Sequence, residues 1–182
     1  MLDFFSLSAK ISVPMKTKTF AEIKAVIDNH TQMRHLSCIQ SGVEMVLKLY
    51  EVIDADSYPE QAIVENDGRG FEPFKGAKSY GGKIVSFTET PYNPISEKAF
   101  ADCERLLSEG VFPVLSFGWQ GGFHSAVAFK DSTNETAFIT KTALGKRHTT
   151  IWAKHEIWPK QTKTEILAVR FGSGPPNAIK NL

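Results

Sequence analysis

Cysteine, net charge and long apolar runs are all scarce in this sequence. Its 182 residues include only two cysteines, Cys38 and Cys103, so the chain is not a disulfide scaffold and we expect free thiols. The 21 basic and 20 acidic residues leave a formal net charge of +1, which is too small to favour nucleic acid as a partner. No segment approaches the roughly 20 apolar residues of a membrane-spanning helix, so we expect no membrane span.

A Sec signal peptide and a metal-binding motif are missing as well. Asp3 stands where a signal peptide carries basic residues, and the apolar run around it is short and interrupted. His148 and His155 lie in a polar stretch that has no cysteine or carboxylate at a metal-binding spacing. We therefore expect no metal and no cofactor. We also expect a cytoplasmic protein, or an effector that is secreted without a Sec signal peptide.

The pattern of apolar residues predicts the fold class. The chain has the length of one ordinary domain and is 42% hydrophobic, so we expect residues 1–182 to form a single domain. Apolar residues at steps of three and four predict helices, and alternating apolar residues predict strands. The predicted helices span 20–27, 38–50 and 96–109, and the predicted strands span 10–14, 83–88, 111–117, 124–131, 136–143 and 165–171. Helices first and an antiparallel sheet second are typical of an α+β fold.

Three further expectations concern the parts between and within these elements. Glycine and proline predict irregular chain from 54 to 94 with at most the short strand at 83–88, and the tail from about 172 is expected to be loose. Because the apolar residues of helix 38–50 share one face, Glu44, Lys48 and Glu51 are expected to face water. Cys103 falls in the apolar stripe of helix 96–109, which indicates core packing.

Cys38 is a candidate nucleophile because it falls on the first turn of a predicted helix. Unpaired backbone N–H groups and the positive end of the helix dipole favour an anion there, so the thiol tends toward the reactive thiolate. A thiol nucleophile also requires a base. His124 begins the predicted strand 124–131, far along the chain, and could meet Cys38 only in the folded protein.

The spacing of these residues resembles that of papain-like cysteine peptidases. Gln32 stands six positions before Cys38, an apolar helix follows the cysteine, and the strand beginning Gly110-Val111-Phe112-Pro113 leads through a loop to His124. Over about residues 10–171 the chain is most similar to bacterial peptidases that process double-glycine leaders. The resemblance implies a papain-like fold with Cys38 as nucleophile and His124 as base. It also implies that Gln32 and the Cys38 backbone N–H bind the oxyanion.

The residue that orients the histidine is not evident. Papain-like peptidases place an Asp or Asn on the strand paired with the histidine strand, where this sequence has only Thr140 and Thr142 as hydroxyl acceptors. Depending on the hairpin register, His124 faces either Ala143 or Thr142. The orienting residue is thus Thr140 or Thr142, comes from elsewhere, or is missing.

The loop before His124 is expected to border the substrate. Gly121 and Gly122 would let backbone approach a ligand closely, and Trp119 would form a wall of the cleft. The resemblance implies hydrolysis of a peptide bond in a peptide or protein substrate. Two alternatives stay open: a bacterial effector that deamidates a glutamine side chain of a protein, and a catalytically impaired papain-like module that binds a partner. The oligomeric state does not follow from the sequence.

Overall fold

Both helices predicted in the N-terminal half form, and a short third helix that was not predicted follows them. The computed structural model describes residues 18–34, 36–63, 70–92, 97–119, 122–141, 149–157 and 161–171. Thr19 caps α1 (Phe20–Asn29) through a capping box in which the Thr19 side chain and the Glu22 carboxylate each bond the other's backbone N–H. The second helix, α2 (Cys38–Leu49), begins at the candidate nucleophile. The short α3 (Pro59–Ala62) follows it.

The described residues after α3 form a seven-stranded sheet and the helices before and between its strands. Its strand order is β1-β2-β7-β3-β4-β5-β6, and neighbouring strands pair antiparallel. The last strand therefore inserts between the second and the third. The elements of this half are η1 (Glu72–Phe74), β1 (Gly76–Tyr80), β2 (Lys83–Tyr92), α4 (Glu97–Ser108), β3 (Pro113–Trp119), β4 (Gly122–Lys130), β5 (Thr136–Lys141), β6 (Thr149–Ala153), α5 (Lys154–Ile157) and β7 (Gln161–Phe171). The predicted α+β class is confirmed.

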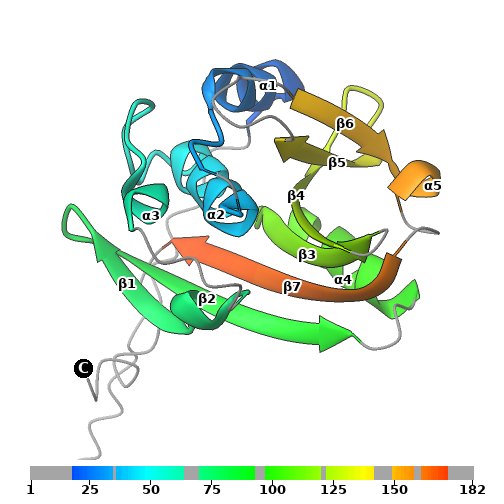
Figure 1. Cartoon of the computed structure of the whole chain (residues 1–182). Coiled ribbons are helices and arrows are strands. Elements are labelled where there is room, and N and C mark those ends of the chain that lie inside the picture. The colour runs from blue at the N-terminus through cyan, green and yellow to red at the C-terminus, as the bar shows by residue number, and fades with distance from the viewer. Residues whose placement is uncertain are drawn as a thin grey trace, which may run out of the picture.

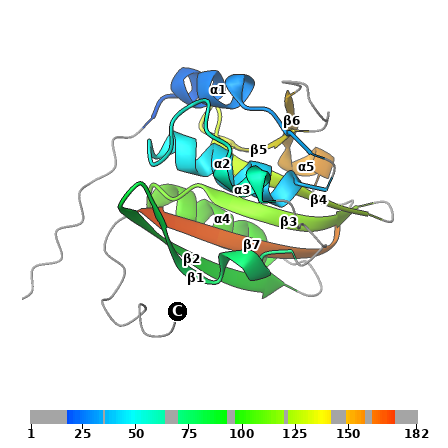
Figure 2. The ribbon, with the colours of Figure 1, turned by 60° about the vertical axis from the view of Figure 1, so that its left-hand side comes forward.

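Helices cover both faces of the sheet, so the molecule has two apolar cores. Helices α1, α2 and α3 gather on one face, while α4 lies behind β3 and β7 on the other (Figures 1 and 2). The first core joins α2 to residues such as Val114, Val127 and Phe129. The second core joins α4, including Cys103, to residues such as Phe117 and Ala126. Alternate residues of β3 and β4 thus belong to opposite faces, as the pleat of a strand requires.

The predicted packing of Cys103 is confirmed, because its side chain is fully buried in the second core. Among the described residues, no helix is long and apolar enough to cross a membrane. The predicted strand 10–14 and the tail from residue 172 lie outside the described residues.

The segment 54–94 is more regular than predicted. It contains the hairpin of β1 and β2, in which Tyr80 pairs with Lys83 across Gly81 and Gly82. Both glycines have positive φ, of 55° and 82°, which suits the two-residue turns of β-hairpins. The Gly81-Gly82 pair was therefore a sequence signal for a hairpin, which the prediction of irregular chain overlooked. Strand β2 also extends four residues beyond the predicted strand 83–88, to Tyr92.

Candidate functional site

Cys38 occupies the position at the start of α2 that the sequence predicts. The preceding Leu36 has a left-handed backbone with φ of 62°, an uncommon conformation for a residue with a side chain. Ser37 stands at the N-cap position but makes no side-chain capping bond. The half-buried Cys38 thiol lies near its own backbone N–H, that of Ile39 and that of Ser125 on β4. The last contact joins residues 87 positions apart and brings the thiol to the strand that carries His124.

Gly42 allows α2 to approach the sheet closely enough for this contact. A Cβ atom at residue 42 would lie 2.9 Å from Val114 Cγ1 and 3.0 Å from Ser125 Oγ. Both distances are shorter than ordinary van der Waals contact, so a larger residue would require these side chains, the helix or the strands to shift. The hydroxyl of Ser125 is buried beneath α2 without a hydrogen-bond partner.

His124 lies directly before Ser125 on β4, but its imidazole leaves the strand on the other side. Ser125 faces α2, whereas His124 is paired with Phe117 and packs edge-on against that ring at a centroid distance of 6.0 Å. Within the described residues, no hydrogen bond or ion pair joins the imidazole to the Cys38 thiol. The Nε2 atom of His124 is buried and has no hydrogen-bond partner. The structure thus brings the thiol beside the backbone of the predicted base without bonding the two side chains.

Burial controls the protonation of both groups. It raises the pKa of the Cys38 thiol, although the three backbone N–H groups act in the opposite direction. It also lowers the pKa of His124. The sequence predicted a thiolate at Cys38, but these shifts indicate a neutral thiol and a neutral imidazole in the resting protein near pH 7.

The two cysteines are expected to differ strongly in alkylation by iodoacetamide. Burial raises the pKa of Cys103 to about 12, and its side chain is inaccessible, whereas Cys38 is half-buried. We expect Cys38 to react first, at a rate that rises with pH above neutrality as the thiolate forms. Mass spectrometry of the modified peptides at a series of pH values measures both rates. Equal labelling of the two cysteines, or a Cys38 rate that is already maximal at pH 6, contradicts this expectation.

Gln32 is placed on the loop that leads into α2. The side chain is buried to 9% exposure, its Nε2 donates to the Arg34 carbonyl at 3.1 Å, and its Oε1 has no hydrogen-bond partner. The amide is therefore held within the loop Thr31–Ser37 and retains one N–H for a further acceptor. Its role as an oxyanion donor stays a prediction.

Thr140 does not bond to His124, and Thr142, the other predicted orienting residue, lies outside the described residues. In the described part of the hairpin Val127 pairs with Ile139, which is the one of the two registers considered that assigns Thr142 rather than Ala143 to His124. The hydroxyl of Thr140 accepts a hydrogen bond from Trp152 Nε1 at 3.1 Å. Thr140 thus bonds β6, and the unpartnered Nε2 of His124 agrees with an orienting residue that is missing from the described chain.

Two of the predicted cleft residues lie at the paired ends of β3 and β4. Trp119, the last residue of β3, pairs through the backbone with Gly122, the first residue of β4. Gly121 and the position of the Trp119 side chain lie outside the described residues. Their contact with a substrate stays a prediction.

A buried polar network on α2 was not predicted. Glu44 and Lys48 are only 0% and 5% exposed, so the expectation that they face water is wrong, and only Glu51 of the three is exposed. The Glu44 carboxylate accepts hydrogen bonds from the backbone N–H groups of Glu60 and Gln61 and from Gln61 Nε2. Lys48 faces His30. Residues of α3 and of the loop before α2 cover this polar side of α2. The spacing of apolar residues within the helix does not show that other segments cover its polar side.

His30 in this network is structural rather than a base. An ammonium group only donates, so Lys48 Nζ, 3.2 Å from His30 Nδ1, fixes the proton on Nε2, which donates to Ser41 Oγ at 2.9 Å. Burial, with Lys48 and Lys141, lowers the pKa of His30 to about 3. A hydroxyl that accepts from the imidazole is not activated by it, so Ser41 and His30 do not form a nucleophile–base pair.

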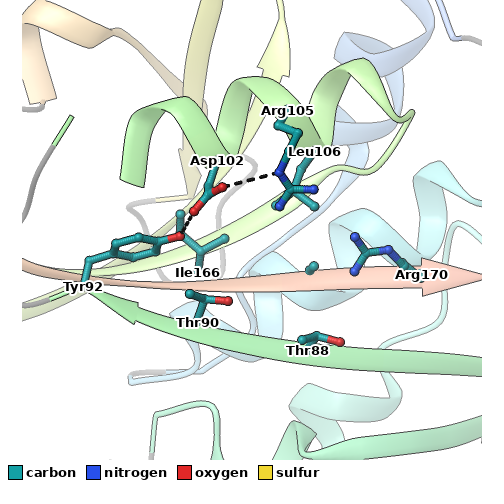
Figure 3. A pocket seen from close by; sticks show the side chains of 9 residues that line it. Thr88, Thr90, Tyr92, Asp102, Arg105, Leu106, Ile166 and Arg170 are labelled. Carbon is teal, nitrogen blue, oxygen red and sulfur yellow. Dashed lines mark hydrogen bonds and ion pairs between the residues drawn. The ribbon is translucent and has the colours of Figure 1, made fainter. Parts of the chain in front are cut away.

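A cavity of about 110 Å³ lies on the α4 face, between α4 and strands β2 and β7. Figure 3 shows Tyr92 and Arg105 directed toward Asp102, whose carboxylate accepts a hydrogen bond from each. Arg170 and Arg105 both pair with Glu109. The charges around the cavity balance one another, so we assign it no part in the chemistry of Cys38, which packs on the opposite face.

Among the described residues, no group of three or more histidine, cysteine or carboxylate side chains could hold a metal ion. No protein-family model matches the chain, and it has no significant match among curated proteins or solved structures.

Proposed function

We propose that this protein is a papain-like thiol hydrolase that cleaves a peptide or side-chain amide bond through Cys38. The observation that supports it most is the close packing of α2 on β4 at Ser125, the chain neighbour of His124, where the Ser125 backbone N–H acts on the Cys38 thiol. A cysteine at a helix N-terminus thus lies beside the backbone of the strand that carries the distant His124, although the imidazole leaves that strand on the opposite face. The resemblance to papain-like peptidases requires the two segments to be neighbours.

In the proposed reaction, the end of β4 at His124 rearranges so that the imidazole leaves the Phe117 face of the sheet and reaches the thiol, since rotation of the side chain alone keeps the ring on that face. The neutral imidazole takes the thiol proton as sulfur bonds the carbonyl carbon, and the carbonyl π electrons move to oxygen. The amide of Gln32 and the Cys38 backbone N–H stabilise this oxyanion. The C–N bond then breaks, the imidazolium protonates the leaving nitrogen, and water hydrolyses the thioester. Free amine or ammonia is released, according to the substrate.

The Gln32→Ala substitution is expected to slow turnover by about 10² to 10³, the usual effect of losing one oxyanion donor. The reason is that its amide acts on the tetrahedral intermediate and not on the resting thiol. Measurements of kcat/KM on any substrate found test the effect on the intermediate, and iodoacetamide alkylation of Cys38 is the control for the reactivity of the thiol. Unchanged turnover, or an unfolded variant, speaks against the assigned role.

A binding module is the second candidate. Two observations favour it: the unpartnered Nε2 of His124 and the raised pKa of Cys38, both of which weaken a thiol–imidazole pair. Incubation of the protein with peptide mixtures and with glutamine-containing proteins, followed by mass spectrometry and an ammonia assay, tests the choice. Release of products that requires Cys38 supports the hydrolase, and retention of an uncleaved partner supports the module.

A further inference from the structure

Gln61 is a buried amide whose hydrogen-bonding capacity is fully used. It lies on α3 at 1% exposure. Its Oε1 accepts from the Met33 backbone N–H at 2.7 Å and from the Ser37 hydroxyl at 2.9 Å, whose single proton is shared with the Arg34 carbonyl at 2.8 Å. Its Nε2 donates to the Thr31 carbonyl at 3.1 Å and to Glu44 Oε2 at 2.6 Å. Two acceptor sites and two N–H groups are all that a glutamine side chain offers.

Three of these four bonds hold the same loop. Thr31 and Met33 flank Gln32, and Ser37 directly precedes Cys38, so the Gln61 amide bonds the chain on both sides of Gln32 and directly before α2. The fourth bond ties the amide to Glu44, which lies on α2 itself. One side chain from a different element therefore bonds the chain on both sides of Gln32, directly before Cys38 and on α2.

The backbone of this loop is held in an unfavourable conformation. Leu36 keeps a φ of 62°, and its apolar side chain is 61% exposed, so packing of that side chain does not compensate the strain. A strained residue persists where its surroundings over-determine it. The bonds from Gln61 on either side of Leu36, to Met33 and to Ser37, supply such a restraint.

We propose that Gln61 is a positioning residue that sets the oxyanion site by fixing Gln32 against the Cys38 N–H. The proposal rests on the proposed thiol-hydrolase function. Gln61 touches neither substrate nor thiol in this role, and it acts only through the loop Thr31–Ser37. Its loss should therefore weaken binding of an oxyanion and leave the nucleophilicity of Cys38 intact.

A peptide aldehyde separates these two properties without a known substrate. With acetyl-Gly-glycinal, the Cys38 sulfur bonds the aldehyde carbon, the C=O π bond opens to an oxyanion, and the thiol proton passes to the imidazole or to that oxygen. Iodoacetamide alkylates the same sulfur with loss of iodide and forms no oxyanion. The dissociation constant of the aldehyde adduct and the alkylation rate are compared in wild type, Gln61→Leu and Tyr80→Phe. Tyr80 donates to Glu60 on α3 and, among the described residues, has no hydrogen bond to the loop, which makes Tyr80→Phe the matched control.

We expect Gln61→Leu to weaken the aldehyde adduct by about 10-fold to 10²-fold, since displacement of a catalytic group by about 1 Å has effects of this size. The alkylation rate should not change, and Tyr80→Phe should behave as wild type in both assays. In the Gln32→Ala background, Gln61→Leu should add little, because both changes remove the same donor. If Gln61→Leu does not fold, Ser37→Ala removes one of the four bonds and should give a smaller loss of the same kind.

Several outcomes would overturn the proposal. One is an unchanged affinity for the aldehyde in a folded Gln61→Leu variant. Another is a Gln61→Leu loss of aldehyde affinity that is as large in the Gln32→Ala background as in wild type. An equal fall in aldehyde binding and alkylation would mean that Gln61 serves only the general structure of the site. Absence of any adduct with wild type would instead count against the thiol-hydrolase function itself.

Discussion

The Cys38→Ala substitution is expected to abolish turnover, with a fall in kcat on the order of 10⁴ to 10⁶, the scale found when a covalent nucleophile is removed. Sulfur forms the bond to the carbonyl carbon, and alanine has no nucleophilic atom to replace it. The variant should fold, because Cys38 is half-buried and alanine keeps its Cβ on the same helix. Product release measured by mass spectrometry, with circular dichroism to verify folding, checks the result.

Cys103→Ala is the matched control for this loss. Cys103 packs in the second core between α4 and the sheet, on the face opposite α2, so its removal should lower stability slightly and leave turnover intact. His124→Ala should reduce turnover by about 10²-fold to 10⁴-fold, which is the usual contribution of a general base. Product formation that persists in Cys38→Ala would exclude Cys38 as the nucleophile. A wild type without turnover that still retains a partner would favour the binding module.

Local patterns explain which elements the sequence could predict. The capping box at Thr19 and the apolar face of helix 38–50 depend on residues a few positions apart, and both helices form within two residues of the predicted bounds. The hairpin of β4 and β5 also follows from local alternation. Strands β1 and β6 were missed, because each is only five residues long and its partner strand supplies the order that its own sequence does not show.

The candidate site was predictable only in part, because it depends on contacts between distant residues. The helix start predicted the place of Cys38, and the strand pattern predicted that of His124. Ser125 faces α2 and His124 faces the other side of β4. This assignment of faces depends on the pairing of β3 with β4, which the sequence alone does not show. Desolvation reversed the expected sign of the Cys38 pKa shift, and burial depends on the whole fold.

The Glu44→Leu substitution is expected to lower the free energy of unfolding by about 3–5 kcal/mol, as when one partner of a buried charged network is removed. Glu44 is fully buried and accepts hydrogen bonds from two backbone N–H groups of α3 and from Gln61 Nε2. All three donors would lose their partner inside the protein, and the buried ammonium of Lys48 would lose a nearby carboxylate. Urea denaturation followed by circular dichroism, with the m-value compared to wild type, measures this change.

Glu51→Leu is the control that distinguishes burial from charge. Both glutamates were expected to face water, but the Glu51 side chain is 79% exposed and pairs with Lys18 at the surface, where such a pair contributes about 0–1 kcal/mol. We therefore expect Glu51→Leu to shift the denaturation midpoint little. Glu44→Gln should lie between the two, since its carbonyl oxygen can still accept from the α3 backbone while its NH₂ group opposes the Gln61 amide. Equal small effects of Glu44→Leu and Glu51→Leu would show that the polar side of α2 contributes little to stability, and that the loop Thr31–Ser37 is held without it.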